Sequence, residues 1–497
     1  MIEKTNTIEF LLNQEKITWQ VKKPTQTLLQ FLREDLHCTG SKEGCAEGDC
    51  GACTAVLVDV FEQKARYQAM NTCISFLPLL DGKQLITVEH LSQKTEAGKL
   101  LLHPCQQAMV EKHGSQCGFC TPGFVMSLFA LSHQQNKDGQ NEGAKKDFVD
   151  KKEQVQNAIA GNLCRCTGYQ PILEAGLEIL NFPKSDQFTK NWQKTKQQLE
   201  EIQPKTSKWI QTEYGSFFSP LNLKDLAQFL QENKAPVLYV NGGTDIGLWV
   251  TKKHQELPNL VFLKNLSELN AIQEKENYLW VGGNVSVNQA LPYLEKYFPN
   301  LKNYLTRFAS TQIRNLATLA GNICNASPIG DLNPVLLALG AKVSFGKPGN
   351  VKKEVELSNF FLDYRKTVLQ PDEILYGVGI PIPKAQSYFQ SYKISKRMEQ
   401  DISALSMSFY FEKGQGLLNN LRLAFGGLAN RPKRALAFEK KVQGQPFSAL
   451  VEEENLKLLQ MDFQPISDMR ASAKYRMEVA KNLIFKQHAL LSKMEGP

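Results

Sequence analysis

Three cysteines crowd into one short, glycine-rich stretch near the start of the chain, KEGCAEGDCGAC at residues 42–53. Cys45, Cys50 and Cys53 follow the spacing C-x4-C-x2-C, and Cys73 supplies a fourth thiol further along. A chain with this feature must fold a loop of small residues around its thiols. The loop has three interpretations: a disulfide staple, a zinc knuckle, or a loop that wraps an iron–sulfur cluster.

The iron–sulfur interpretation is favoured by the spacing and by the neighbouring residues. C-x4-C-x2-C with a distant fourth cysteine is the plant-type ferredoxin spacing for a 2Fe–2S cluster. Gly44, Gly48 and Gly51 leave room for the loop to approach such a cluster, and glycine readily takes the positive φ angles that this requires. Structural zinc sites usually pair C-x2-C units or combine cysteine with histidine.

A second set of thiols lies in SQCGFCTPGF and GNLCRCTGYQP, at Cys117, Cys120, Cys164 and Cys166. Thr121-Pro122 and Gln170-Pro171 predict helices that begin beside each pair. Positive helix ends lower thiol pKa values and suit an anionic cluster. Taken alone, this second set also fits zinc. A cluster immediately before it favours a second 2Fe–2S cluster, because electron carriers usually work in chains.

The composition excludes several other classes of protein. The chain has 497 residues, and its net charge of +8 is not gathered into a dense Lys/Arg block, as nucleic-acid binding would require. No apolar run is long enough for a signal peptide or a membrane span, so we expect a cytoplasmic protein. Metal or redox chemistry then explains the cysteines better than disulfides. Cys38, Cys105 and Cys324 are expected to fill small apolar slots.

The patterning along the chain predicts four domains. Short β-like runs fill residues 5–90, helical patterns follow from about 91, and mixed patterns return after a polar stretch. The predicted domains are 1–91, 92–183, 212–385 and 386–497, with a Lys-, Gln- and Thr-rich linker at 184–211. The polar residues 133–149 are predicted to be a surface insertion.

Two small-residue loops in the third predicted domain suggest phosphate binding. Neither a Rossmann fingerprint nor a P-loop motif occurs. NGGTDIG alone is more consistent with an ordinary turn than with phosphate binding, whereas LAGNICNASPIGDLNP leads into Asn322 and Asp331. Two such loops could cradle a pyrophosphate with their backbone N–H groups.

Together these motifs resemble a known family. GCAEGDCGACTAVL, SQCGFCTPGF and GNLCRCTGYQPI resemble the paired iron–sulfur domains of the molybdenum hydroxylases, which include xanthine dehydrogenase and aldehyde oxidase. NGGTDIG, RFASTQIRNLATLAGNICNASPIGDLNP, KISKRMEQDI and LAFGGLANRPKRA are similar to the flavin domain and the domain that follows it. The chain stops where single-chain members continue into the molybdenum domain. That layout resembles the small iron–sulfur/FAD subunit of bacterial xanthine dehydrogenase.

The resemblance implies an α+β multidomain fold. Its parts would be a β-grasp plant-type 2Fe–2S domain, a four-helix-type 2Fe–2S domain, a two-part α+β FAD-binding domain that is not a Rossmann fold, and a C-terminal α+β domain. The implied cofactors are two 2Fe–2S clusters, held by the two sets of four cysteines, and FAD. The positions that match the family's FAD contacts are Val240, Asn241, Gly242, Gly243, Thr244, Asp245, Phe308, Thr318, Gly321, Asn322, Asp331, Leu375 and Lys393.

The implied activity is that of an NAD-dependent xanthine dehydrogenase, which converts hypoxanthine to xanthine and xanthine to urate. Electrons would pass from molybdopterin on a large partner subunit through the Cys117 cluster and the Cys45 cluster to FAD and NAD+. The purine site, and with it every catalytic residue, would lie on the partner, in a heterotetramer of two small and two large subunits. A related hydroxylase acting on an aldehyde or N-heterocycle, and a non-catalytic electron-transfer protein, are the alternatives.

Two further positions matter for this interpretation. Gln116 resembles a residue that faces the molybdopterin of the partner chain. KRMEQDI matches a mobile loop near the flavin that influences NAD access, and Gln400 stands there where relatives often carry an acid. An amide neither repels an anion nor pairs with a cation as a carboxylate does.

Overall fold

The N-terminal strand pattern folds into a five-stranded sheet of order β3-β2-β6-β4-β5. The computed structural model describes residues 1–134, 151–182, 186–414 and 416–494. A hairpin, β2–β3, lies at one edge, β6 runs parallel to β2, and β4 pairs antiparallel with both β6 and β5. The β-grasp domain predicted above is confirmed. Its elements are β2 (Thr7–Leu12), β3 (Glu15–Gln20), α1 (Leu28–Gln30), η1 (Phe31–Asp35), β4 (Thr54–Phe61), β5 (Lys64–Asn71), η2 (Thr72–Ile74), η3 (Leu77–Leu80) and β6 (Gln84–Ile86).

A helical domain follows, and its helices begin where the proline pairs predict. α3 begins at Thr121 and α5 at Gln170. Phe124 and Phe129 of α3 are fully buried in a core that also takes in Val56 of β4. Nearly all of the predicted insertion at 133–149 lies outside the described residues. The elements are η4 (Val88–His90), β7 (Gln93–Lys94), β8 (Leu100–Leu101), α2 (Pro104–Glu111), α3 (Thr121–Gln134), α4 (Lys151–Ile159) and α5 (Gln170–Ile179).

The stretch 184–211, predicted to be a linker, is folded wherever the structure describes it. It forms α6 (Gln187–Lys190), α7 (Trp192–Ile202) and most of β9 (Ser207–Thr212). Leu199 and Ile202 of α7 are buried against Leu11 of the β-grasp sheet. Its polar composition conceals an amphipathic helix, because only one face of α7 needs apolar residues.

β9 belongs to a second sheet, in which the first strand of the chain lies beside strands that follow the helical domain. Its order is β1-β9-β10-β12-β11, so the first strand of the chain pairs in parallel with β9. Phe217 and Phe262 from this sheet share a core with the β-grasp domain. The new elements are β1 (Ile2–Thr5), β10 (Gly215–Ser219), β11 (Leu238–Val240), α9 (Ile246–Thr251), β12 (Asn259–Phe262), η6 (Leu263–Asn265) and α12 (Thr311–Arg314).

The chain divides into two compact units. The first comprises Met1–Asp225, Lys234–Asn265 and Ala309–Leu316, and the second comprises Leu226–Asn233, Leu266–Phe308 and Ala317–Pro497. The predicted domain 212–385 is therefore shared between the units, and α8 (Leu223–Glu232) contains the first crossing. The domain boundaries drawn from the sequence stay a prediction.

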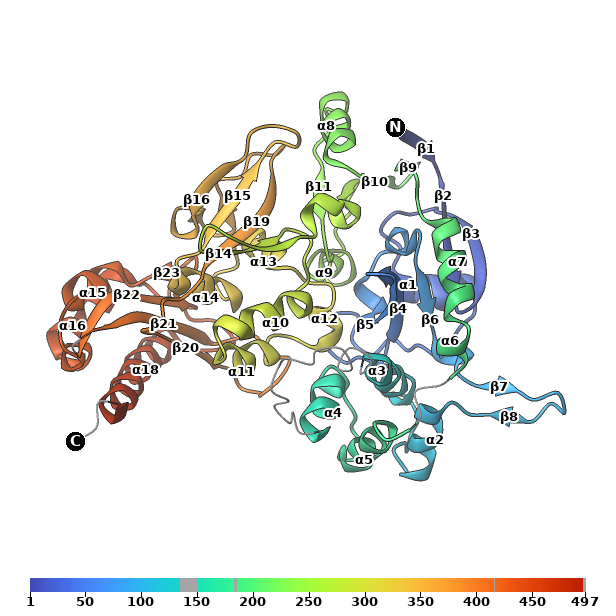
Figure 1. Ribbon diagram of the computed structural model, residues 1–497, viewed down its shortest axis with the longest axis horizontal. Coiled ribbons are helices and arrows are strands. Elements are labelled where there is room, and N and C mark those ends of the chain that lie inside the picture. Colours follow the sequence, from blue (N-terminus) through green and yellow to red (C-terminus); the bar gives the residue numbers. More distant parts are fainter. Residues whose placement is uncertain (135–150, 183–185, 415, 495–497) are drawn as a thin grey trace. The chain divides into compact units, whose positions relative to one another are not determined.

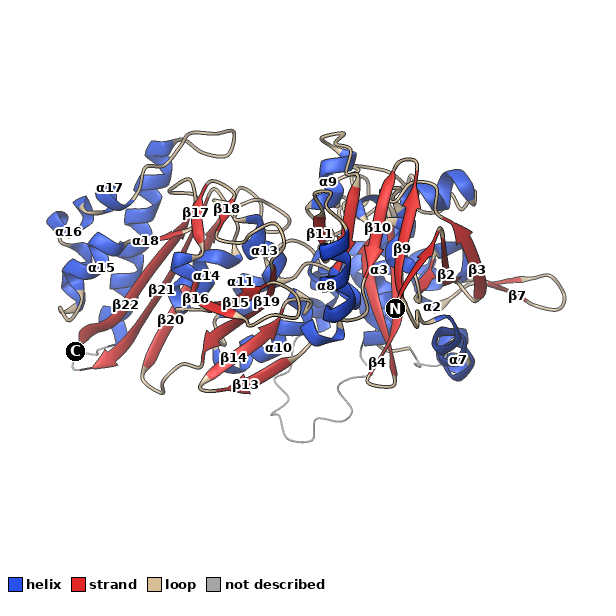
Figure 2. Cartoon of the chain, turned by 90° about the horizontal axis from the view of Figure 1, so that it is seen from above, coloured by secondary structure: helices blue, strands red, loops and turns tan. Residues whose placement is uncertain are grey.

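The second unit contains two larger antiparallel sheets (Figure 1), of order β13-β14-β19-β15-β16 and β20-β21-β22-β23. Helices α15 to α18 gather on one side of the second of these sheets (Figure 2), where Phe409, Phe438 and Ile484 share one core. The strands are β13 (Ile272–Lys275), β14 (Tyr278–Gly282), β15 (Lys342–Gly346), β16 (Lys353–Glu356), β17 (Phe361–Asp363), β18 (Lys366–Thr367), β19 (Ile374–Pro381), β20 (Ser387–Ile394), β21 (Leu405–Gly414), β22 (Leu417–Gly426) and β23 (Lys433–Arg434).

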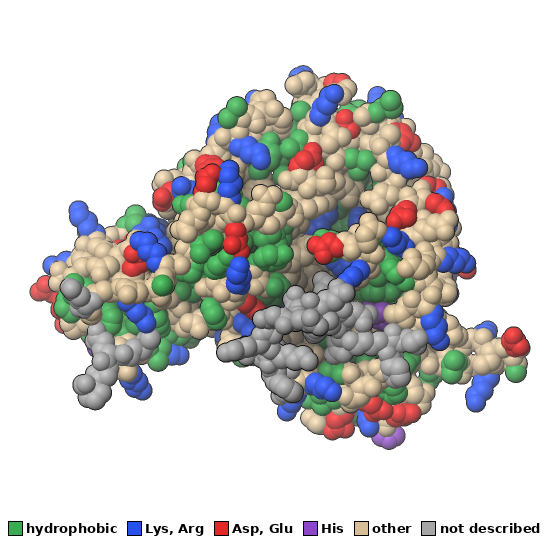
Figure 3. Space-filling model, viewed as in Figure 1, with side chains coloured by type: hydrophobic (Ala, Val, Ile, Leu, Met, Phe, Trp, Pro, Cys, Tyr) green, Lys and Arg blue, Asp and Glu red, His purple; other side chains and the backbone are tan. Residues whose placement is uncertain are grey.

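The helices of the second unit complete the fold. They are η7 (Ser267–Leu269), α10 (Val287–Tyr297), α11 (Leu301–Thr306), α13 (Leu319–Asn325), α14 (Leu332–Leu339), η8 (Leu357–Asn359), α15 (Leu436–Val442), η9 (Phe447–Val451), α16 (Glu453–Lys457), α17 (Leu459–Asp462) and α18 (Ala473–Met494). No helix within the described ranges is long and apolar enough to cross a membrane. On the described part of the face shown in Figure 3, basic and acidic side chains are intermixed.

Candidate functional site

The first four cysteines come together in the first unit. Hydrogen bonds between thiols link Cys45 to Cys50 and to Cys73, and Cys73 to Cys53. The backbone N–H groups of Glu47 and Cys50 also donate to Cys45 Sγ, at 3.4 and 3.3 Å. The hydrogen bonds from Cys50 and Cys73 lower the pKa of Cys45, while the same contacts raise the pKa values of Cys50 and Cys73. A hydrogen bond from Cys73 lowers the pKa of Cys53 as well, so two thiols of this set favour the thiolate form that binds metal ions and iron–sulfur clusters.

The glycines of this loop act in two ways. Gly48 and Gly51 have positive φ angles of 81° and 66°, as predicted. Gly44 does not have a positive φ angle. It leaves room for a thiol instead, because a Cβ at Gly44 would lie 2.8 Å from Cys50 Sγ. A side chain at Gly44 would therefore displace a thiol of the set.

The second four cysteines pair at the surface of the helical domain. A hydrogen bond links Cys120 to Cys164, and another links Cys117 to Cys166. Burial raises the pKa of Cys164, but hydrogen bonds from Thr167 and from the Cys166 amide outweigh it and lower that pKa. Burial and the hydrogen bond to Cys164 raise the pKa of Cys120 to about 12. Cys117 and Cys166 are exposed, as is Gln116 beside them.

These contacts bear on the three interpretations of the cysteine loop. All eleven cysteines of the chain are free, so the structure contains no disulfide staple. Within the described residues, no three Cys, His, Asp or Glu side chains converge as ligands of a single metal ion. Ligation of two clusters by the eight cysteines therefore stays a prediction.

The remaining cysteines divide into two kinds. Cys105 is fully buried in the helical core, as predicted for an apolar slot, and Cys38 is half-buried. Cys324 is exposed, so that prediction is wrong for this residue. It lies near the C-terminal end of the short helix α13, which buries Leu319, Ala320 and Ile323 instead.

In the first unit, residues 240–245 form the turn between β11 and α9. Gly243 has a φ of 72°, which only glycine adopts readily, and Asp245 precedes the first residue of α9. Helix α9 lies directly on η2, because a Cβ at Gly247 would be 2.2 Å from the carbonyl oxygen of Ile74. Since Ile74 follows Cys73, the predicted flavin loop abuts the first cysteine set.

In the second unit, the loops around α13 leave an acceptor for a bound group. Thr318 caps the helix by accepting a hydrogen bond from Gly321 N at 2.9 Å. The Oδ1 atom of Asn322 is buried and has no hydrogen-bond partner among the described residues. A buried acceptor without a donor is costly, and the ribityl hydroxyls of FAD are donors of the required kind. The residues here fit the predicted cofactor.

Asp331 and Lys393, both predicted to contact FAD, bind one another. Lys393 Nζ donates to Asp331 Oδ2 at 2.6 Å and to the carbonyl oxygen of Arg307 at 3.0 Å. Ser403 Oγ donates to the other carboxylate oxygen at 2.5 Å. Their charges are thus already paired, and we expect them to support the site rather than to supply free charge.

The two apolar residues predicted to contact FAD differ in burial. Leu375 is buried in the core of the second unit, so its side chain serves packing. The carbonyl oxygen of Leu375 lies close to Gly283, because a Cβ added at Gly283 would be 2.6 Å from that oxygen. Phe308 is half-buried at the edge of the same core. Only Phe308 of the two keeps part of its ring at the surface of the unit.

Arg307 contacts the loop that the resemblance describes as mobile, at Met398, and the residues just before it. The guanidinium group of Arg307 donates to the carbonyl oxygens of Met398 and Lys393 and to Ser395 Oγ, at 3.0, 3.2 and 3.2 Å. Gln400 sits in this loop with a φ of 48°. Sequence reasoning missed Arg307, because its partners lie 86 to 91 residues away.

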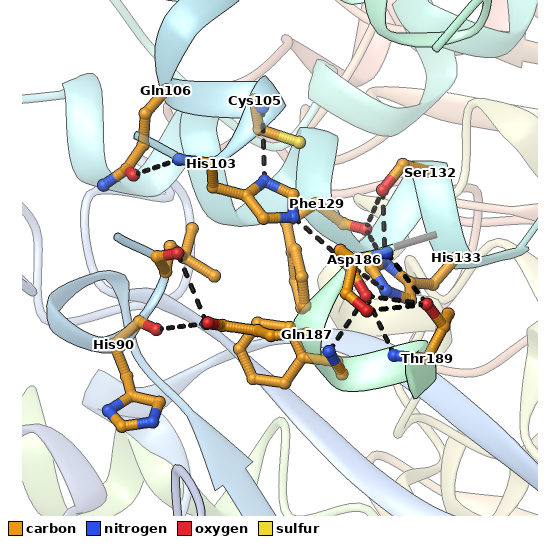
Figure 4. Close-up of polar contacts among 12 residues, drawn as sticks. His90, His103, Cys105, Gln106, Phe129, Ser132, His133, Asp186, Gln187 and Thr189 are labelled. Atoms are coloured by element: carbon orange, nitrogen blue, oxygen red, sulfur yellow. Dashed lines mark hydrogen bonds and ion pairs between the residues drawn. The ribbon is translucent and has the colours of Figure 1, made fainter. Parts of the chain in front are cut away.

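A buried histidine–aspartate–histidine cluster lies in the helical domain, away from both cysteine sets in the sequence (Figure 4). His103 Nε2 and His133 Nε2 lie 3.0 and 2.9 Å from the same oxygen, Asp186 Oδ2. His103 Nδ1 accepts from the Cys105 amide, so its Nε2 carries the hydrogen and cannot bind a metal ion. Asp186 also caps α6 by accepting from the amides of Phe188 and Thr189. This cluster is structural.

Replacing Asp186 with asparagine is expected to lower the free energy of unfolding of the first unit by about 3 kcal/mol. Burial raises the pKa of Asp186, but hydrogen bonds from His103 and His133 outweigh it and lower that pKa well below its usual range. A lowered carboxylate pKa means that this stabilisation is complete at neutral pH and is lost only below about pH 4. Urea denaturation of the wild type and the variant at pH 7.5 measures the difference; equal midpoints would contradict the assignment.

Four parts of the chain match protein families, in this order along the sequence. Residues 10–77 match the 2Fe-2S iron-sulfur cluster binding domain, and 87–177 match the [2Fe-2S] binding domain. Residues 211–383 match the FAD binding domain in molybdopterin dehydrogenase, and 390–490 match the CO dehydrogenase flavoprotein C-terminal domain. The two predicted 2Fe–2S domains and the predicted FAD-binding domain are thereby confirmed.

Curated relatives of the chain are xanthine dehydrogenases. The chain is 29% identical to xanthine dehydrogenase/oxidase of Gallus gallus over 551 aligned residues, which cover 96% of this chain and 39% of that protein. It is 31% identical to xanthine dehydrogenase of Calliphora vicina, over 85% of this chain and 34% of that protein. The chain therefore spans between a third and two fifths of the length of these relatives.

Solved structures share part of the fold. Carbon monoxide dehydrogenase from Hydrogenophaga pseudoflava aligns with a TM-score of 0.51 and 20% identity, over 54% of this chain and 94% of the matched chain. Reconstituted CO dehydrogenase from Oligotropha carboxidovorans aligns with a TM-score of 0.50 and 21% identity over the same shares. The four domain matches and the xanthine dehydrogenase relatives show that the chain belongs to the molybdenum hydroxylase family, whose two 2Fe–2S modules and FAD module it carries.

Proposed function

We propose that the chain is the electron-transfer part of an NAD-dependent xanthine dehydrogenase. Electrons taken from xanthine or hypoxanthine at a molybdopterin centre on a partner chain would leave through this chain to NAD+. The curated relatives that match it over most of its length are named xanthine dehydrogenases, which supports the substrate. The partner enters the proposal because the matched domains are iron–sulfur and flavoprotein domains, and the chain spans 39% of the length of the Gallus gallus relative.

One observation carries the proposal: all eight predicted cysteines assemble into two sets within one compact unit. The first set would be the ligands of one 2Fe–2S cluster and the second set those of the other. Helix α9, which follows the predicted flavin loop, packs on the turn that carries Cys73. This packing supports the proposed order, with the Cys45 cluster next to FAD.

We propose that FAD is held by the residues that match its contacts in the family. Bound flavin supplies the conversion between one-electron and two-electron transfer that NAD+ requires. Thr318 and Gly321 would shape the loop, Asn322 would offer its unpaired oxygen, and the Lys393–Asp331 pair would keep the loop rigid. The full set is Val240, Asn241, Gly242, Gly243, Thr244, Asp245, Phe308, Thr318, Gly321, Asn322, Asp331, Leu375 and Lys393.

The surface near the second cysteine set suits a partner. Cys117 and Cys166 are exposed, and the aromatic and aliphatic side chains of Phe119, Leu163 and Tyr169, close to these cysteines in the sequence, are exposed as well. Exposed apolar side chains that share a region often mark interaction sites. We propose that the molybdopterin-binding chain covers this region, with Gln116 facing it, in a heterotetramer of two chains of each kind.

Anaerobic purification of the chain tests the proposal. We expect iron, acid-labile sulfide and bound flavin, and NADH:dye reductase activity without any oxidation of xanthine by the isolated chain. A sample loaded with FAD and iron that does not oxidise NADH would contradict the NAD assignment. Colourless protein that contains zinc would contradict the electron-transfer function itself.

A further inference from the structure

The loops that carry the two cysteine sets touch each other directly. The backbone N–H of Leu163 donates to the carbonyl oxygen of Cys50 at 2.9 Å. Cys164 is the residue that follows Leu163. Cys50 of the first set and Cys164 of the second set are therefore connected through backbone bonds and a single hydrogen bond.

This contact is possible because three glycines lie at the junction. A Cβ at Gly51 would lie 2.1 Å from the carbonyl oxygen of Gly161, and a Cβ at Gly123 would lie 2.2 Å from the carbonyl oxygen of Gly51. Backbone atoms cannot move aside as a flexible side chain can, so any other residue would force the loops apart. The close approach is specific to these positions.

A buried glutamine from a distant part of the sequence holds both loops. Gln312 of α12 is fully buried, and its Nε2 lies 3.1 Å from Asn162 Oδ1, 3.1 Å from Ser127 Oγ and 3.4 Å from Thr54 Oγ1. Thr54 follows Cys53, and Asn162 lies two residues before Cys164. Asn162 Nδ2 in turn donates to the carbonyl oxygen of Gly51 at 3.0 Å.

The arrangement is not what stability alone would favour. The Oε1 atom of Gln312 is buried and has no hydrogen-bond partner among the described residues, which costs free energy. Each partner of its Nε2 keeps another hydrogen bond: Ser127 donates to Asn162 Oδ1, and Thr54 donates to the carbonyl oxygen of Gly51. An apolar side chain of similar shape at 312 would leave no buried donor unpaired. We therefore attribute the amide of Gln312 to its role in fixing the positions of the two cysteine loops.

We infer that Gln312 is a positioning residue that holds the two cysteine loops together, so that the Leu163–Cys50 hydrogen bond lies on the electron path between the clusters. The inference rests on the proposed function, since it needs both clusters. Electrons pass faster along bonded and hydrogen-bonded atoms than across a gap. Loosening the junction should slow transfer between the clusters without changing their ligands.

The test compares the intact chain with its Gln312→Leu variant after anaerobic purification. We expect unchanged iron and sulfide content, a several-fold slower electron exchange between the clusters, a weaker magnetic interaction between the two reduced clusters, and faster amide hydrogen exchange at Leu163. Gln312→Met, which matches the side chain in length, repeats the measurement if the leucine variant does not fold. Thr311→Val is the matched control: it removes the hydrogen bonds of the Thr311 hydroxyl, to the carbonyl oxygen of Asn157 and from Arg314, and leaves the Gln312 amide in place.

The possible failures are distinct. Two intact clusters with unchanged exchange, magnetic interaction and Leu163 protection in the Gln312 variants would overturn the inference and leave the proposed function standing. Wild-type protein without 2Fe–2S signals would overturn the proposed function and the inference with it. An equal loss of exchange rate in Thr311→Val would show that α12 as a whole, rather than the Gln312 amide, sets the junction.

Discussion

Replacing Cys53 with serine is expected to remove one 2Fe–2S cluster and to lower the iron content by about half. Cys53 is buried, and its hydrogen bond with Cys73 lowers the pKa of Cys53, as suits a metal-binding thiolate. A serine hydroxyl stays protonated at neutral pH and is a far poorer ligand. One of the two electron paramagnetic resonance signals of the reduced chain should disappear, while bound flavin remains.

Two companion variants sharpen this prediction. Cys166→Ser should remove the other signal, because Cys166 belongs to the second set. Cys324→Ser changes an exposed cysteine outside both sets, and both signals should survive. If Cys53→Ser keeps both signals at full intensity, Cys53 is not a ligand and the first cluster must be held otherwise.

Replacing Lys393 with methionine is expected to destabilise the second unit by about 3–5 kcal/mol. The side chain of Lys393 is 2% exposed, and within the described residues it is the only cation that forms an ion pair with the buried Asp331 carboxylate. Without it, an ionised carboxylate stays buried against Ser403 alone, which is far more costly than burying a matched pair. Chemical denaturation and FAD content of the purified variant measure the effect, and both should fall.

A lysine of the same unit supplies the control. Lys384 forms an ion pair with Glu412 at 2.9 Å, and the two side chains are 72% and 22% exposed. Lys384→Met should therefore cost only about 0–1 kcal/mol. Adding Asp331→Leu to Lys393→Met should restore much of the lost stability, because the unpaired charge is then gone. Equal effects of the two lysine variants would show that burial of the Lys393–Asp331 pair is energetically unimportant.

Features determined by local spacing were predictable from the sequence. The C-x4-C-x2-C loop with Cys73, the second cysteine set, and the helix starts at Thr121 and Gln170 follow from residues a few positions apart. Such features are encoded by backbone preferences and by the reach of neighbouring side chains, so a short stretch contains all the information. The family resemblance then supplied the domain types, which the domain matches confirm.

Other features could be decided only by tertiary packing. The sequence of α7 resembles a linker because its apolar face has meaning only against Leu11, and the ion pair of Lys393 with Asp331 joins two residues that are far apart in the sequence. Gln312 meets Asn162 from 150 residues away, and nothing in the spacing of either residue indicates this contact. A hydrogen bond between distant residues depends on how whole elements pack, and that packing is set by the summed burial of many side chains. Short stretches of sequence therefore specify which cofactors this protein can bind, whereas long-range packing sets how closely its two cysteine loops are joined.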